Sequence, residues 1–186
     1  FMHSNFLLLQ RTFRGFKVPG EVIHAAGSDR DGVAHEPPKL GVMGVENLGI
    51  KDGSSTSSER EVRMLTVDTL AAERNITHID WLTVDTEGND ARVLRGAKAL
   101  LTARAVRVIE FEYHGVGKWG SEDRVGDVVT WLSGLQYTCF WQSNGGALSP
   151  FLPECDYEFH YWSNVVCVRD AHSAKLLSLL VPPALR

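Results

Sequence analysis

The apolar residues of this chain fall into short runs, separated by stretches in which apolar residues recur with helical spacing. The runs predict strands at residues 21–29, 62–67, 76–85, 105–113, 137–141 and 164–168. The helical spacing predicts helices at residues 4–14 and 69–74, after Gly88, at 125–134 and before Pro182. Alternating strands and helices favour an α/β fold with a largely parallel sheet. The last two strands are joined by a loop, which favours an antiparallel pair at the sheet edge.

Several segments carry local start and stop signals. Residues 31–60 are rich in Gly, Pro and Ser, and we expect an exposed loop with short strand pieces there. Asp68 is expected to cap the N-terminus of the helix at residues 69–74, and Asn75 to end it. The helix after Gly88 is expected to pack on the sheet through Val93, Leu94, Ala97, Leu100 and Leu101.

The N-terminal residues form an amphipathic pattern rather than a signal peptide. Their apolar core, Phe6 to Leu9, is too short for a signal peptide, and the basic residues follow it instead of preceding it. A helix with Phe6, Leu9 and Phe13 on one side is expected. Because the chain opens on Phe1, directly before this helix, we expect the sequence to begin inside a longer protein, with any targeting segment upstream.

Composition narrows the class of protein. The chain has 186 residues, of which 44% are hydrophobic and 23% are charged. This length and composition are typical of a soluble globular protein, so residues 1–186 are expected to form one domain. A net charge of -4 without a basic face gives no indication of a nucleic-acid partner. No segment approaches the roughly 20 apolar residues of a membrane span. The spacing of the three cysteines indicates neither a zinc site nor a disulfide framework, and Cys139 and Cys167 are expected to be buried reduced thiols.

The stretch WLTVDTEGNDARVL, Trp81 to Leu94, holds the first candidate chemistry. An apolar run, expected to be a buried strand, ends at Asp85 and Glu87, and a helix follows Gly88. Ligands of open α/β sheets bind outside the carboxyl ends of the strands. A carboxylate there is able to accept a proton or orient a nucleophile. The structural alternative is that Asp85 caps the helix and Glu87 complements its dipole, while Gly88 supplies a backbone shape.

Several motifs, in order, resemble the C-terminal part of FkbM-type methyltransferases. They are HAAGSDRDG, VDTL, IDWLTVDTEGNDARVLRGA, IEFEY and WSNVVCV, and the stretch from Asp85 to Ala97 is the most specific. The resemblance implies a Rossmann-like class I sheet, mostly parallel with an antiparallel edge. It also implies S-adenosylmethionine as cofactor and O-methylation of a hydroxyl on a small molecule or glycan. The methyl acceptor itself and the oligomeric state are not indicated.

The resemblance also assigns residues. It implies catalytic roles for Asp85, Glu87 and Glu112, and cofactor contacts for Ser28, Asp29 and Asp85. As plain turn formers, Ser28 and Asp29 would be equally expected where they stand. The family's first strand with its glycine-rich turn, and the acid of its second strand, have no counterpart here, so the isolated chain is expected to bind the cofactor weakly. Thr83 stands where the family usually has lysine.

Other side chains are secondary candidates. Glu110 and Glu112 are expected on one face of their strand, and two acids there need a partner or a ligand. His114 is either a base or a surface histidine. An aromatic group is expected either to line an acceptor pocket or to pack on the sheet edge; it comprises Trp141, Phe151, Tyr157, Phe159, Tyr161 and Trp162.

Two further functions stay open at this stage. No histidine spacing indicates a metal, and none is expected, although Asp85 and Glu87 are able to hold a divalent cation for sugar or phosphate chemistry. The other alternative is a non-catalytic, Rossmann-like binding domain.

Overall fold

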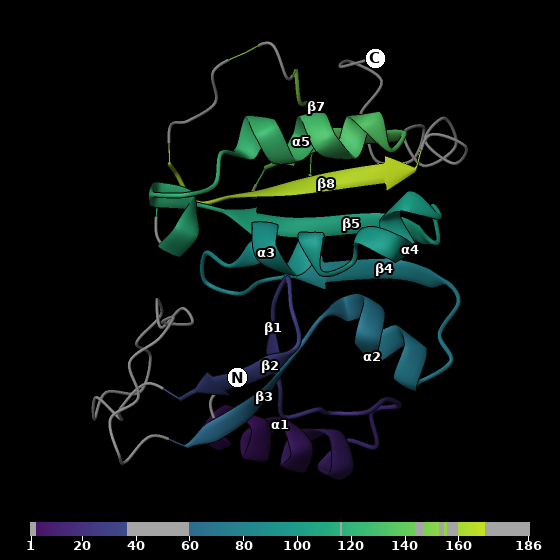
Figure 1. Ribbon diagram of the computed structural model, residues 1–186, viewed down its shortest axis with the longest axis vertical. Coiled ribbons are helices and arrows are strands. Elements are labelled where there is room, and N and C mark those ends of the chain that lie inside the picture. Colours follow the sequence, from purple (N-terminus) through teal and green to yellow (C-terminus); the bar gives the residue numbers. More distant parts are fainter. Residues whose placement is uncertain are drawn as a thin grey trace.

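The computed structural model describes residues 3–36, 60–115, 117–143, 147–152, 155 and 160–169. Within them the strands form two sheets, one of three strands in the order β1-β3-β2 and one of five in the order β4-β5-β8-β6-β7. Figure 1 shows the small sheet with helix α1 in the lower half of the view and the large sheet with helices α3, α4 and α5 in the upper half. The expected C-terminal helix before Pro182 lies outside the described residues.

The small sheet is built from the N-terminal third of the chain. Helix α1 (His3–Gly15) confirms the predicted helix, but none of its residues is buried, and Leu9 of the predicted apolar side is 49% exposed. Strand β1 (Ala26–Gly27) pairs in parallel with β3 (Glu61–Leu65), and β2 (Gly32–His35) pairs with β3 in the antiparallel sense. Strand β1 is much shorter than the run predicted at residues 21–29.

The large sheet contains the remaining strands. Strands β4 (Ile79–Val84) and β5 (Val106–Tyr113) are parallel. Strand β8 (Ser163–Arg169) lies antiparallel between β5 and β6 (Tyr137–Gln142), and β7 (Leu148–Pro150) pairs with β6. The late strands thus form the antiparallel pair expected from the sequence.

The prediction of a mostly parallel sheet is wrong, because antiparallel pairings outnumber parallel ones in both sheets together. The reason is the position of β8. Strands β5 and β6 run in the same direction, since each is antiparallel to β8. By inserting between them, β8 converts what would be one parallel contact into two antiparallel ones. The fold is a mixed α/β structure with two mixed sheets.

The main core lies between the large sheet and its helices (Figure 1). These helices are α3 (Asp90–Arg95), α4 (Lys98–Thr102) and α5 (Val125–Gly134). As predicted, Val93 and Leu94 of α3, Ala97 between the two helices and Leu101 of α4 are buried, and Leu100 packs against the cluster. Strand β5 sends Ile109, Phe111 and Tyr113 into this core.

The start of helix α2 (Val67–Glu73) differs from the prediction for Asp68. Thr66 is the N-cap, because its hydroxyl accepts a hydrogen bond from the Thr69 amide at 3.0 Å. Asp68 instead accepts the amides of Ala99 and Leu100 at 2.8 and 3.0 Å, and so caps α4. Asn75 has a φ of 53°, the left-handed conformation expected of the residue that ends a helix.

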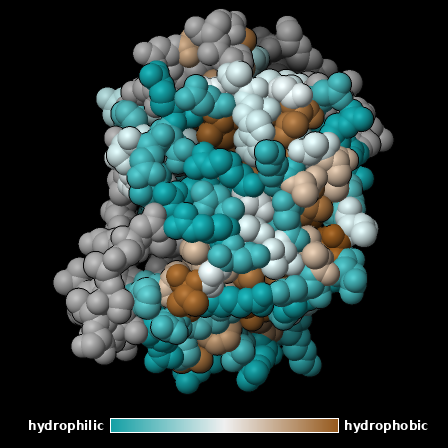
Figure 2. Space-filling view, in the orientation of Figure 1, coloured by the Kyte–Doolittle hydropathy of each residue, from teal (hydrophilic) through white to brown (hydrophobic). Residues whose placement is uncertain are grey.

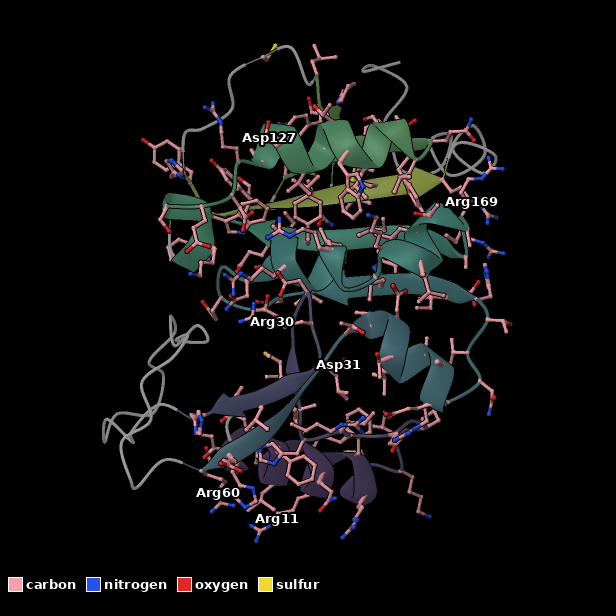
Figure 3. The ribbon with its side chains drawn as sticks, in the orientation of Figure 1. Arg11, Arg30, Asp31, Arg60, Asp127 and Arg169 are labelled. Carbon is pink, nitrogen blue, oxygen red and sulfur yellow. A yellow bond between two sulfur atoms is a disulfide. The ribbon has the colours of Figure 1, made fainter. Side chains whose placement is uncertain are left out.

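Asp31 ties the small sheet to the same helix start. Its carboxylate accepts the Thr66 amide at 2.8 Å and the Thr69 hydroxyl at 2.6 Å (Figure 3). These bonds hold the pKa of Asp31 below its usual range, so the contact is strongest with Asp31 ionised.

Strand β4 is more exposed than predicted. Trp81 is 50% exposed and Thr83 is exposed, while Val84 is the one fully buried residue of the strand. The cause is the sheet order, because β4 pairs with β5 on one side and forms the edge of the described sheet on the other. Figure 2 shows separate hydrophobic patches among mostly hydrophilic residues rather than one continuous apolar face. No helix among the described residues is long and apolar enough to cross a membrane.

The expectation of reduced thiols is wrong for two cysteines. Cys139 of β6 and Cys167 of β8 form a disulfide, with their Cα atoms 4.0 Å apart. The strand register explains the bond, because the two residues are directly opposite each other in the antiparallel pair. The sequence indicated that the two strands pair, but not the register that places the two cysteines opposite each other.

Replacing Leu94 by alanine tests the core. Leu94 is 0% exposed, so Leu94→Ala is expected to lower the free energy of unfolding by about 2–5 kcal/mol, measured by urea denaturation. The matched control is Leu8→Ala, since Leu8 is 64% exposed. The control is expected to stay within about 0.5 kcal/mol of the unchanged chain. Equal losses in the two variants would contradict the placement of α3.

Counting thiols tests the disulfide. In denaturant without reductant, the chain is expected to show a single reactive thiol, that of Cys155, and three after reduction. The bond closes a loop with a sequence separation of 28, so reduction is expected to lower the free energy of unfolding by about 3–4 kcal/mol. Three reactive thiols before reduction would show that the bond does not form.

Candidate functional site

The turn between β4 and α3 carries the predicted catalytic acids. In the parallel pair, Val84 lies opposite Phe111, so Asp85 and Glu112 follow at the same end of neighbouring strands. Glu87 and Gly88 both have positive φ, 53° and 91°. For Gly88 this confirms the expected role of supplying a backbone shape. For glutamate this conformation is uncommon and is associated with functional sites.

The segment after β5 holds this turn in place. The Lys118 amide donates to the Gly88 carbonyl oxygen at 3.0 Å. Gly117 has a φ of 65°, and a Cβ atom on it would lie 2.7 Å from the carbonyl oxygen of Glu87. A residue with a side chain therefore does not fit at position 117 without moving one of the two segments.

The structural alternative for Asp85, a helix cap, is not what the structure shows. The N-cap of α3 is Asn89, which makes no side-chain capping bond, and the Asp85 side chain is exposed at the end of β4. Asp85 is thus accessible to a ligand.

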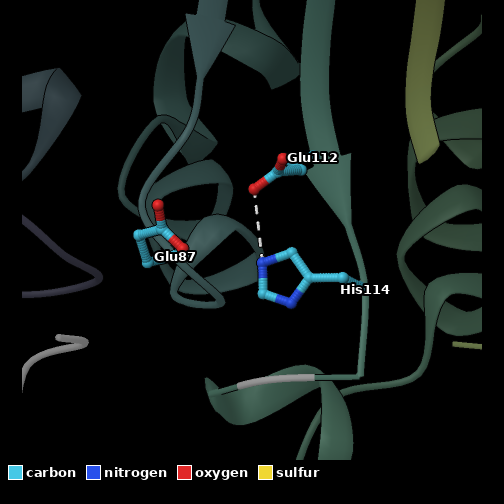
Figure 4. Close-up of side chains that lie close together, drawn as sticks. All are labelled: Glu87, Glu112 and His114. Carbon is cyan, nitrogen blue, oxygen red and sulfur yellow. Dashed lines mark ion pairs between the residues drawn. The ribbon is translucent and has the colours of Figure 1, made fainter. Parts of the chain in front are cut away.

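Glu87, Glu112 and His114 come together at this end of the sheet (Figure 4). One possible ligand atom from each lies within 4.8 Å of the others. His114 Nε2 is 3.3 Å from an Oε2 atom of Glu112, and the imidazole is fully buried. His114 is therefore not the surface histidine that the sequence left open, and its neighbours make it part of the acidic site.

Negative charge is concentrated around Glu112. Burial, followed by the charges of Asp85, Glu87 and Asp90, raises the pKa of Glu112 to about 7, and a hydrogen bond from Trp162 acts in the opposite direction. Burial lowers the pKa of His114. Its imidazole is therefore biased toward the neutral form at this end of the sheet.

Asp90 is a site residue that sequence reasoning missed. It is 0% exposed, and its Oδ2 atom accepts the Gly88 amide at 3.2 Å. Burial raises the pKa of its carboxyl to about 6, with the charge of Asp85 acting in the same direction. Within the described residues, Asp90 Oδ1, Asn89 Oδ1 and Thr86 Oγ1 are buried without a hydrogen-bond partner. The repeated acids of DTEGND were the available signal.

The expected cofactor residues lie at the other end of α3. Ser28 is 2% exposed, and its hydroxyl donates to Asp29 at 3.1 Å. The Ser28 carbonyl oxygen contacts Gly96, which follows α3, whereas Glu87 precedes the helix. A six-residue helix is about 9 Å long, so the two predicted sets stand at opposite ends of one short element.

The remaining candidates are the second acid of strand β5, Glu110, and the aromatic group. Glu110, on the same strand face as Glu112, accepts hydrogen bonds from Trp81 Nε1 at 3.1 Å and from Asn164 at 3.3 Å, so it has the partners that a half-buried acid needs. Trp162 stacks on His114 with ring centroids 4.8 Å apart, while Trp141 stacks on Phe151.

The aromatic group thus does not form one cluster. Part of it covers the acidic site and part packs on the sheet edge. Tyr161 is exposed, and Tyr157 and Phe159 lie outside the described residues.

A cavity of about 370 Å³ opens on the helical side of the large sheet. Its lining residues are Asp127 of α5, which is labelled in Figure 3, and Ala91, Arg95, Lys98, Glu122, Asp123, Arg124, Val128 and Trp131. Its lining mixes both charges and does not include Asp85, Glu87 or Glu112, so it is separate from the acidic site.

A mixed α/β fold with acids at neighbouring strand ends is an arrangement found in enzymes that bind ligands at the mouth of a sheet. A family model, the methyltransferase FkbM domain, matches residues 16–159. The chain therefore belongs to the FkbM methyltransferase family, which confirms the resemblance seen in its motifs. No curated protein and no solved structure gives a significant match.

The buried carboxyl of Asp90 predicts a pH-dependent stability. Its folded pKa of about 6 exceeds the usual 3.8, so the unfolded chain loses this proton first as pH rises. Stability is then lost between about pH 4 and pH 6, by up to about 3 kcal/mol. The variant Asp90→Asn has no carboxyl to titrate at this position, so it does not share this loss. Its free energy of unfolding minus that of the unchanged chain is expected to be larger at pH 7 than at pH 4, measured by urea denaturation. A difference that does not change with pH would contradict the burial of an ionisable Asp90.

Proposed function

We propose that this chain is the catalytic part of an S-adenosylmethionine-dependent O-methyltransferase that acts on a hydroxyl group of a small molecule or sugar. The match to the FkbM domain over residues 16–159 carries the proposal. It is supported by Asp85, Glu87 and Glu112, which stand at the adjoining ends of two parallel strands.

The residues around the turn fit a polar ligand. Thr86 Oγ1 and Asn89 Oδ1 are buried without a hydrogen-bond partner in the described part of the chain. Such groups are costly unless something bonds to them. The amino group of S-adenosylmethionine, or an acceptor hydroxyl, is able to donate to either atom, and the carboxylate of S-adenosylmethionine is able to accept from the Thr86 hydroxyl. Ser28 and Asp29 are the residues that would hold the adenine end.

Each acid has a role that follows from its surroundings. S-adenosylmethionine supplies an electrophilic methyl group when bound. Asp85, exposed at the strand end, accepts the proton that the acceptor hydroxyl loses. Glu87 and Glu112, both half-buried, orient that hydroxyl. The role of Asp85 separates this proposal from a non-catalytic binding domain, in which its charge would not affect a reaction.

Replacing Asp85 by asparagine tests this role in the full protein. Asp85→Asn keeps the size of the side chain but removes its basicity, so kcat is expected to fall by about 10²- to 10⁴-fold with an unchanged Tm. The measurement is formation of S-adenosylhomocysteine with a hydroxyl compound that supports turnover of the unchanged enzyme. Asp80→Asn, an exposed acid on the same strand, is the matched control and is expected to retain full kcat. Normal turnover of Asp85→Asn would exclude Asp85 as the proton acceptor.

A further inference from the structure

We propose that Glu87, Glu112 and His114 form a binding site for one divalent transition-metal ion, of the Mn²⁺ or Zn²⁺ class. The residues come from two segments, the turn after β4 and the end of β5, and their side chains converge (Figure 4). No metal was expected from the sequence, in which no histidine spacing indicates one, although Asp85 and Glu87 were left open as ligands of a divalent cation.

The distances are close to those of a coordinated set. Ligand atoms of a zinc-type ion lie about 2.0–2.2 Å from it, so any two of them are at most about 4.4 Å apart. The three candidate atoms lie within 4.8 Å of one another, and His114 Nε2 and Glu112 are already 3.3 Å apart. Glu87 and Glu112 are half-buried glutamates, whose flexible side chains need to close by only a few tenths of an ångström.

Charge and burial provide an independent reason for a cation. Asp90 is 0% exposed, has an oxygen atom without a hydrogen-bond partner in the described part of the chain, and is close enough for its charge to act on Glu112. The charges of Asp85 and Glu87 act on Glu112 in the same direction. A doubly charged ion at this point offsets the mutual repulsion of the carboxylates.

The ligand types select the class of metal. Imidazole nitrogen suits zinc and other transition metals, whereas Mg²⁺ and Ca²⁺ prefer an all-oxygen set. His114 is fully buried and has its Nε2 atom directed at Glu112. The site is therefore expected to bind Mn²⁺ and Zn²⁺ more tightly than Mg²⁺.

A role of this ion in methyl transfer rests on the proposed function, whereas the binding of the ion by the three side chains does not. An ion held by Glu87 and Glu112 would lie at the strand ends that Asp85 shares, and its charge would favour the ionised form of an acceptor hydroxyl there. Metal binding and methyl transfer are therefore measured separately.

The test is calorimetric titration of the full chain, freed of metal by a chelator and dialysed, with MnCl₂, ZnCl₂ and MgCl₂. We expect one site for Mn²⁺ and for Zn²⁺, with affinity at least tenfold higher than for Mg²⁺. Quenching of tryptophan fluorescence by paramagnetic Mn²⁺ is a second readout, because Trp162 stacks on His114. Absence of Mn²⁺ and Zn²⁺ binding, or equal affinity for Mg²⁺, would overturn the proposal.

Variants assign the site. Glu87→Gln keeps the size of a half-buried side chain, so the variant is less prone to unfold than one changed at the fully buried His114. This variant is expected to bind Mn²⁺ at least tenfold more weakly. His78→Gln is the control, because His78 Nε2 lies 3.4 Å from Asp80 in an exposed pair outside the cluster. The control is expected to bind Mn²⁺ as the unchanged chain does. Binding that survives Glu87→Gln but is lost in His78→Gln would place the metal elsewhere and refute the assignment.

Two outcomes keep this inference distinct from the proposed function. Methyl transfer that continues unchanged in excess chelator, with no metal binding in the titration, refutes the metal site and leaves the methyltransferase proposal intact. Metal binding that depends on Glu87, in a protein that transfers no methyl group to any tested hydroxyl, supports the site and counts against the proposed function.

Discussion

The parallel pairing of β4 with β5 is the constraint on which the acidic site depends. With Val84 opposite Phe111, the two strands end level with each other. Any other register would move Glu112 along the strand, and a shift by one residue would turn it toward the hydrophobic core. Backbone hydrogen bonds between the two strands thus position the acidic site, while other side chains of these strands, such as Val84 and Phe111, pack in the core.

Much of the fold follows from local sequence pattern. Strand β5 and helix α5 appear close to where apolar spacing predicted them, because each buries one face against the same core. The single helix predicted after Gly88 is present as two short helices, α3 and α4, which bury their apolar residues in that core. What local pattern does not contain is which strands become neighbours. For that reason the exposure of Trp81 and the antiparallel majority of strand pairs were not foreseen. The pairing of the last two strands was predicted, but its register, which brings Cys139 opposite Cys167 and allows the disulfide, was not.

The same distinction applies to the site. Asp85, Glu87 and Glu112 were identified because their motif resembles a family, and strand periodicity placed Glu112 on one face. The burial of His114 was not predictable, since it involves contacts distant in sequence, among them Trp162, which lies 48 positions later in the chain and stacks on the imidazole. Asp90 was overlooked because an acid at the start of a helix ordinarily needs no further explanation. Its full burial is what marks it as unusual.

The close contact at Gly117 limits which changes of sequence and length the two adjoining segments tolerate. The missing side chain of Gly117 lets the segment after β5 lie directly on the backbone of Glu87 and Gly88, with no space between them. The turn after β4 and the segment after β5 are 29 residues apart from Gly88 to Gly117 but are packed directly against each other, so neither is able to move without the other. A relative or an engineered variant that lengthens either segment has to reshape the other, so acceptor preference is expected to change by exchange of both segments together.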